Sequence, residues 1–430
     1  MKKMFWKDAS LLFLLGFGML TFTMSSCSED DCACEPEEEE QVLLPPVALE
    51  CDYFTQDRVL VNDPDRPVDY LIDCYMKISG DVQIQIEPGV VIAFAADAGM
   101  SFRDEVGFEA LGTPNEPIVF TGTSANKGHW RGLIFYSSNS NTKLQHTVIE
   151  YAGGKAFTEM SPHYEGSVAV AHDARVAFDH LTVRDGGTHG LQLNGGNSEV
   201  STSALLVTGN EGVPVKISAY HTHILDATSS FSGNASDFIN VVSEYYAIEQ
   251  TARWNKLDVP YLVDGRVHVK NGGHLSIEAG VELQFKSSAY LQAGDMLPYD
   301  YSIRIEGSPS APVILTAANG SNWGGLHFSF TQEDNLISNA VIEYAKGDFA
   351  AANKSNSGAI YMHADPKISI SNTMFQHLPN YALYAYTGAG TSRPDLPNLS
   401  LDSNSFVNVA KGNEADSHLG WGGGSGVSYP

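Results

Sequence analysis

The densest group of side chains suited to proton transfer lies in HDARVAFDHLTVRDGG, residues 172–187. It contains the weak catalytic candidates Arg175, His180, Arg184 and Asp185. An arginine can act as the base that removes a proton next to a sugar carboxylate, if a cation or a second positive group neutralises that carboxylate. The chemistry that these residue types would support is therefore eliminative cleavage of an acidic sugar chain.

A second copy of this stretch, ADPKISISNTMFQHLPN at residues 364–380, lacks most of the charge. It keeps Lys367, but the remainder holds Asn372, Gln376 and His377. The loss of charge in one copy would be expected if only the other copy retained a functional site. It would be expected equally if these residues form a solvent-exposed face whose sequence has changed without consequence. We favour the solvated face and assign no catalytic residue from the sequence.

Other kinds of site have less support. Hydrolysis of a glycosidic bond needs two carboxylates about 5–9.5 Å apart. The motifs of pectin-depolymerising hydrolases, Asn-x-Asp, Asp-Asp, Gly-His-Gly and Arg-x-Lys, do not occur as a set, and Thr188 replaces a glycine before His189. His221 and His223 would share one face of a strand, but no third ligand is evident, so we predict no metal site.

The elements that carry these residues are predicted to be short β-strands. Alternating apolar runs such as VQIQI, VVIAF, PIVFT and VAFDHLTV recur between clusters of Gly, Asn, Ser and Pro. Period-two alternation with β-branched residues is typical of strands with one buried face. The best helical segment, residues 247–258, is weak. We therefore predict an all-β protein.

The strands belong to two copies of one sequence. IEPGVVIAF at residues 86–94 matches IEAGVELQF at residues 277–285, and VIEYA occurs at both Val148 and Val341. Further matched pairs are YLIDCYMKI with YLVDGRVHV, FEALGTPNEPIVFT with IRIEGSPSAPVILT, and WRGLIF with WGGLHF. The offsets stay close to 193 residues, which indicates a tandem duplication covering roughly 66–230 and 257–410.

The repeated corners predict a coil. In IQIEPGVVIAF a Glu-Pro-Gly corner joins two strands without the Asn-Gly reversal that a tight hairpin prefers. Repeated corners without reversals wind a chain into coils that stack through parallel ladder bonds, with an apolar column inside. The motifs LSIEAGVELQF, IEGSPSAPVILTA, WGGLHF and AVIEYA resemble the right-handed parallel β-helix proteins common among Bacteroidetes surface lipoproteins. We favour one continuous solenoid over two.

The N-terminus resembles a lipoprotein export signal. Three lysines precede the apolar run LLFLLGFGMLTFTM, which is too short to span a membrane, and TMSSC follows it. The resemblance implies lipidation at Cys27. The acidic stretch SEDDCACEPEEEE that comes next would stay solvated, and resembles the signal that directs such lipoproteins to the outer face of the outer membrane.

These observations predict the following division of the chain: a signal peptide at 1–26, an acidic tether at 27–45, a first β-helix half with an N-terminal cap at 46–240, a second half at 241–415, and a Gly-rich tail at 416–430. Cys51 and Cys74 could form a disulfide contributing about 3 kcal/mol, although with Cys32 and Cys34 three pairings are open.

Two recurrent aromatic residues leave two interpretations open. Trp130 and Trp323 open equivalent strands before a glycine. If exposed, they would stack on sugar rings, and if buried, they would fill the apolar column. Glu150 and Glu343 recur in VIEYA, which a structural role would also produce.

Charge and fold together suggest binding rather than catalysis. The formal net charge of −26 disfavours nucleic acid, which needs a basic face. We expect a lipid-anchored, surface-exposed scaffold that binds glycan or a protein partner without catalysis and without a cofactor. The alternative is a carbohydrate-active enzyme, a polysaccharide lyase before a glycoside hydrolase, and only a lyase would call for Ca²⁺.

Overall fold

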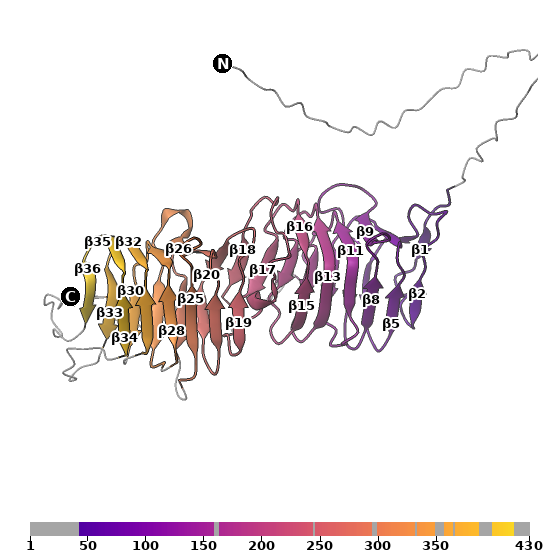
Figure 1. Cartoon of the computed structure of the whole chain (residues 1–430). Helices are drawn as coiled ribbons and strands as arrows, with labels where there is room; N and C mark the ends of the chain where they lie inside the picture. The colour runs from indigo at the N-terminus through magenta and orange to yellow at the C-terminus, as the bar shows by residue number, and fades with distance from the viewer. Residues whose placement is uncertain are drawn as a thin grey trace, which may run out of the picture. The chain divides into compact units, whose positions relative to one another are not determined.

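The computed structural model describes residues 43–158, 163–243, 246–294, 299–331, 333–348, 357–363, 366–386 and 398–416. In this part of the chain thirty-six short strands form four sheets. The strands pair in parallel with the strand of the next coil, as when Leu133 lies beside Met100 and Leu326 beside Ile360. The chain thus winds as a right-handed parallel β-helix, which confirms the predicted fold (Figure 1).

Two of the sheets contain most of the first half. The first, with eleven strands, consists of β1 (Val47–Leu49), β2 (Arg58–Leu60), β3 (Tyr70–Ile72), β5 (Gln83–Ile86), β6 (Val91–Phe94), β8 (Gly107–Leu111), β9 (Ile118–Gly122), β11 (Lys143–Glu150), β13 (Arg175–Arg184), β15 (Glu199–Ser203) and β16 (Leu206–Thr208). The second, with thirteen strands, runs through both halves and consists of β4 (Tyr75–Ile78), β7 (Gly99–Phe102), β10 (Gly132–Phe135), β12 (Val168–Val170), β14 (Leu191–Leu193), β17 (Val215–Ser218), β18 (Ile239–Val242), β20 (Tyr261–Asp264), β23 (Glu282–Phe285), β26 (Val313–Ala317), β29 (Ala340–Glu343), β32 (Met374–Leu378) and β35 (Ser405–Val409).

The second half adds two sheets of six strands. One consists of β19 (Thr251–Trp254), β22 (His274–Ile277), β25 (Ser302–Glu306), β28 (Asn335–Ser338), β31 (Ile368–Ser371) and β34 (Leu399–Asp402). The other consists of β21 (Arg266–Val269), β24 (Tyr290–Gly294), β27 (Gly325–Ser329), β30 (Gly358–His363), β33 (Tyr381–Tyr386) and β36 (Gly412–Asp416). Two 3₁₀ turns, η1 (Thr222–Ile224) and η2 (Ala318–Gly320), complete the described elements.

The repeated phrase marks the same corner in both halves. Ile86 ends β5 and Phe94 ends β6, just as Ile277 ends β22 and Phe285 ends β23. Gly89 at the first corner has a φ of 83°, which a residue with a side chain rarely adopts. The corner therefore changes the chain direction without folding it back, so each coil climbs onto the last.

The core is one column of inward-facing side chains. Successive residues of a strand point to opposite faces, and the inward set is fully buried in coil after coil. Phe94 stacks on Trp130 with ring centroids 4.1 Å apart, and Phe285 stacks on Trp323 at 3.9 Å. Each fully buried large apolar side chain contributes roughly 1.5–3 kcal/mol, so the column stabilises the coil stack along its length.

The two halves meet at a seam, residues 219–260, where the strand series changes. Strand β17 pairs with β18, and β18 pairs with β20. By the sequence match, however, β20 is the equivalent of β3, which lies in the other sheet of the first half. The thirteen-stranded sheet is therefore continuous across the seam but joins strands that are not equivalent, while the first sheet ends and a new one begins with β21.

The seam corrects one local prediction. Residues 247–258, the best helical segment, contain strand β19 instead. Its side chains alternate between exposed and buried, and Trp254 lies in the core. The segment forms a strand because the two-residue period of a strand points both Ala252 and Trp254 into the column, whereas a helix would point them in different directions. The predicted boundary at 240/241 falls within β18.

The N-terminal cap carries a covalent link. Cys51 and Cys74 form a disulfide with Cα atoms 6.1 Å apart, which confirms that prediction. The predicted signal peptide, Cys27, Cys32, Cys34, nearly all of the tether and most of the C-terminal tail lie outside the described residues. No helix within the described ranges has the length and apolar character to cross a membrane.

Candidate functional site

The four candidates on β13 do not form one site. Arg175 and Arg184 stand at opposite ends of this ten-residue strand, which bends at His180. Arg175 forms an ion pair with Glu199 at 2.8 Å, and Arg184 forms one with Glu150 at 2.6 Å. The charge that is dense in the sequence is divided between the two arms of a bent strand, which pair with β15 and β16, so the four residues do not form one site.

The other two candidates occupy separate surface positions. His180 sits at a corner with a φ of 52°, with its Nδ1 atom 2.8 Å from Asp179. Its ring is tilted against that of His146, with ring centroids 4.5 Å apart. Asp185 lies 4.0 Å from the ammonium group of Lys127. Arg175 and His180 line two different depressions, so even these two candidates do not share a site.

The paired tryptophans are structural. Trp130 and Trp323 are both 0% exposed, and each indole N–H donates to the backbone carbonyl of the recurring glutamate, Glu150 or Glu343, at 2.8 Å. A buried ring cannot stack on a sugar, so the prediction of glycan contacts at these two residues was wrong. The interpretation in which they fill the column describes the structure.

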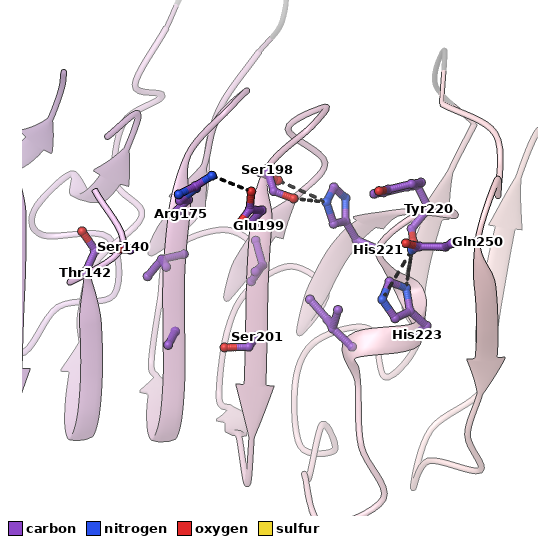
Figure 2. Close-up of a pocket in the computed structure, with 14 residues that line it drawn as sticks. Ser140, Thr142, Arg175, Ser198, Glu199, Ser201, Tyr220, His221, His223 and Gln250 are labelled. Atoms are coloured by element: carbon purple, nitrogen blue, oxygen red, sulfur yellow. Dashed lines mark hydrogen bonds and ion pairs between the residues drawn. The ribbon is translucent and has the colours of Figure 1, made fainter. Parts of the chain in front are cut away.

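A polar groove opens at the seam. Three successive layers of the stack, β13, β15 and η1, form its floor, and Gln250 closes it before β19 (Figure 2). Its volume is about 420 Å³. We call it the seam groove, and its polar lining consists of Ser140, Thr142, Arg175, Ser198, Glu199, Ser201, Tyr220, His221, His223 and Gln250.

His221 holds the 3₁₀ turn in place. Its Nε2 atom donates to the carbonyl of Ser198 at 2.9 Å, and its Nδ1 atom accepts from the hydroxyl of Ser218 at 2.8 Å. Burial lowers the pKa of His221, which keeps the ring neutral in this role. With both ring nitrogens engaged, His221 is a structural residue rather than a reacting one.

The turn also corrects how the two histidines were placed. The stretch YHTHIL was treated as a strand, in which His221 and His223 would point the same way. Instead, Thr222 hydrogen-bonds to the carbonyl of Ser218 at 2.9 Å and the chain turns. The side-chain hydroxyls of Ser218 and Thr222 compete with the strand ladder for backbone groups, so a turn replaces the strand.

His223 lines the groove and has its imidazole tautomer fixed by a backbone hydrogen bond. Its Nδ1 atom donates to the carbonyl of Tyr220 at 2.9 Å, which fixes the tautomer and leaves a lone pair on Nε2. The amide nitrogen of Gln250 lies 3.3 Å from the Nδ1 atom and 3.5 Å from the Nε2 atom of His223, the latter at the outer limit of a hydrogen bond. Burial lowers the pKa of His223, so the imidazole is an unprotonated base near neutral pH.

Positive charge in the groove comes from Arg175. The side chain of Arg175 is 46% exposed, and that of its partner Glu199 is 67% exposed. An exposed ion pair is worth at most about 1 kcal/mol, so an incoming carboxylate can displace Glu199 at little cost. The groove thus combines a base at His223, a hydroxyl at Tyr220 and an anion-binding group at Arg175.

Most residues of the seam groove could not be identified from the sequence. Tyr220, Ser198 and Gln250 belong to three different coils and share no motif. One signal was present, since the matched copies stop near residue 230 and resume near 257. A break in a regular repeat is where a stacked coil cannot continue unchanged, and the groove lies beside that break.

One further group of metal-ligand types exists among the described residues. Cys51, Asp73 and Cys74 bring their ligand atoms within 4.8 Å of one another. The two sulfur atoms are joined in the disulfide, so they are not available as thiolate ligands.

Comparison with known proteins gives a domain-level similarity. Residues 246–364 match the model of the pectate-lyase-like β-helix domain. The A-module of mannuronan C-5 epimerase AlgE4 from Azotobacter vinelandii is similar over 85% of this chain and 88% of that chain, at 12% identity and a TM-score of 0.25. No curated protein matches the chain.

Proposed function

We propose that this protein is a carbohydrate-active β-helix protein that binds an acidic polysaccharide in the seam groove and cleaves it by elimination. The observation that carries the proposal is His223, a neutral imidazole with its tautomer fixed, in the same groove as Tyr220 and Arg175. The match to a pectate-lyase-like β-helix domain supports a carbohydrate-active role. This replaces the non-catalytic scaffold that the sequence favoured.

The reaction needs a base, an acid and a positive charge. Arg175 pairs with the carboxylate of a uronic acid and stabilises the negative charge that develops when the α-proton leaves. The Nε2 atom of His223 takes that proton, a carbon–carbon double bond forms, and the bond to the glycosidic oxygen breaks. The hydroxyl of Tyr220 gives its proton to the departing oxygen. One chain becomes two, without water, and one new end is unsaturated.

No cofactor is part of this proposal. Pairing with Arg175 supplies the positive charge that a cation would otherwise provide, and among the residues described as lining the groove Glu199 is the single carboxylate. Hard cations such as Ca²⁺ prefer several oxygen ligands. We therefore expect cleavage to be unaffected by a chelator, and a loss of activity restored by Ca²⁺ would contradict this.

The test is a cleavage assay on uronic-acid polysaccharides, with pectate and alginate among them. We expect the ultraviolet absorbance of an unsaturated uronide to appear with the wild-type protein and to be lost in Arg175→Ala and His223→Ala. The matched control is Arg184→Ala, which removes an equally exposed arginine from the far end of the same strand. If no product forms on any such polysaccharide, the elimination mechanism is wrong.

A second candidate is glycan or protein binding without cleavage. It is favoured by the ion pair of Arg175 with Glu199, which engages the guanidinium in the structure. Glycan-array binding that depends on Arg175, with no shortening of the chain and no unsaturated product, would support this function in place of the first.

We also propose that the protein is anchored by a lipid on Cys27 and faces outward at the cell surface, as in Bacteroidetes lipoproteins. The support is the signal-like N-terminus and the acidic stretch that follows it. Metabolic labelling with a fatty acid should mark the wild-type protein and leave Cys27→Ala unlabelled. Protease treatment of intact cells should then distinguish an outward from a periplasmic orientation.

A further inference from the structure

We infer that a second carbohydrate subsite lies next to the seam groove, on strands β19, β22 and β25, and that it binds the carboxylates of a longer uronic-acid chain. This inference rests on the proposed function, because it extends the same ligand beyond the reacting residue. It predicts a preference for polymers over short oligosaccharides.

The subsite is a depression of about 610 Å³. Its walls include Thr251 and Arg253 of β19, Ser276 of β22, Glu306 of β25 and Glu278, which directly follows β22. The two depressions adjoin, because Gln250 lines the seam groove and Thr251, the next residue, lines this one. The turn η1 contacts both β15 and β19, so an extended chain can pass from one to the other along the strand stack.

Two arginines stand in one register row across these strands, and of the two Arg253 lines the depression. Arg253 is in register with Ser276, and Ser276 is in register with Arg304. The arginines are thus two strand layers apart, about 10 Å, with a small hydroxyl side chain between them. We call this arrangement the arginine notch. It offers two guanidinium groups to carboxylates that lie on alternate rings of an extended sugar chain.

Both arginines of the notch form ion pairs with neighbouring glutamates. Arg253 pairs with Glu278, and Arg304 pairs with Glu306 at 2.9 Å and donates to the carbonyl of Asp334 at 3.0 Å. The side chains of Arg253 and Arg304 are 68% and 35% exposed. Exposed ion pairs contribute little to stability, so ligand carboxylates can replace the glutamates. The planar guanidinium group of each arginine can then bind a carboxylate through two parallel hydrogen bonds.

The test measures binding by calorimetry, with a trisaccharide and an octasaccharide of uronic acid as probes. Arg253→Ala and Arg304→Ala should each weaken octasaccharide binding about tenfold, and the loss should shrink with the trisaccharide, which the seam groove alone can hold. Lys286→Ala is the matched control, since it removes an exposed basic residue, paired with Asp264, from a position that lines neither depression.

The outcomes separate this inference from the proposed function. Wild-type affinity for the octasaccharide in the Arg253→Ala, Arg304→Ala double variant would overturn the subsite, even if Arg175→Ala abolished cleavage. A length preference that depends on the two arginines, with no product from any chain, would support the subsite and overturn elimination. Failure of the wild-type protein to bind either probe would overturn both.

Discussion

The two halves of the β-helix share an interior and differ on the outside. In each, a tryptophan stacks on a phenylalanine and donates to the carbonyl of the same recurring glutamate. One carboxylate oxygen of each glutamate accepts from an equivalent threonine, Thr121 or Thr316. The other oxygen has different partners, since Glu150 binds Arg184 while Glu343 accepts from Gln376. Inward positions stay alike because each must fill the same column, whereas outward positions are free to change.

Outward rows of equivalent sheets show the difference most clearly. On β10 and β12 the outward residues Ile134 and Ala169 pack with Phe157 and Tyr164. On the equivalent β27 and β30, the outward residues are His327 and Tyr361, which pack edge to face with ring centroids 5.3 Å apart. The outward strand residues Ile134 and Ala169, which we call the aliphatic layer, therefore correspond to His327 and Tyr361, the aromatic layer of the second half.

The seam groove lies at the end of the first copy, and Gln250 adds one residue from the segment between the copies. It forms where the first half ends and the strand series changes, with residues from β13, β15 and η1 and with Gln250 at the approach to the second half. A duplication supplies two identical scaffolds, and the irregular join between them supplies the concave, polar surface. Chemistry is therefore expected at the seam and not on equivalent positions in both halves.

The substitution with the largest expected effect tests whether the seam groove carries out the chemistry. His223→Ala should lower the rate of cleavage about 10²–10⁴-fold, the usual worth of a positioned base. Because the pKa of His223 is lowered, the acid limb of the wild-type pH–rate profile should have its midpoint below the ordinary value of 6.5. Activity that survives in His223→Ala, or a midpoint above 6.5, would remove His223 from this role.

The shared interior predicts equal losses of stability in the two halves. Trp130→Ala and Trp323→Ala should each cost about 3–5 kcal/mol, as measured by denaturant unfolding, because each leaves a cavity in the column. Trp130→Phe and Trp323→Phe retain most of the bulk but leave a buried carbonyl without its donor, at about 1–3 kcal/mol. A large difference between the two positions would show that the column is not equivalent in the halves.

The aromatic layer of the second half predicts a pH-dependent stability that the aliphatic layer cannot have. Burial lowers the pKa of His327 to about 4, so the unfolded chain binds this proton more readily than the folded one. The contribution of neutral His327 to the free energy of unfolding is fully present above pH 6.5. It decreases by about 3 kcal/mol as the pH drops toward 4. Thermal unfolding of His327→Gln should show a shallower loss over this window than wild type, and parallel curves would contradict the assignment.

The smallest expected effect concerns the recurring glutamates. Arg184→Gln gives the first half the same Glu–Gln pair that the second half has at Glu343 and Gln376. We expect a loss below about 1 kcal/mol, because the arginine is half exposed. Thermal unfolding at low and at high salt measures it, and the difference from wild type should vanish at high salt. A larger, salt-independent loss would mean that the pair is structural.

Most of the fold was predictable from short patterns. The duplication and the parallel coil follow from spacings that a linear sequence displays, whereas the Cys51–Cys74 disulfide was one of three open pairings. The weak helical candidate at 247–258 contains a strand, because the burial of Trp254 in the column decides its conformation. The tryptophans were ambiguous for the same reason, since a residue type does not reveal which face of a strand points inward.

The site was far less predictable. The charge cluster on β13 stands out in the sequence, yet its members are divided between the two arms of a bent strand. The residues that do meet, Arg175, Tyr220, His223 and Gln250, are spread over some seventy-five positions.

Alternation and repetition, properties of neighbouring residues, were enough to specify a coiled all-β chain in two copies. The groove was decided by tertiary structure, because stacking at about 4.8 Å per layer brings together residues one full coil apart, and because the join between the copies does not preserve their register.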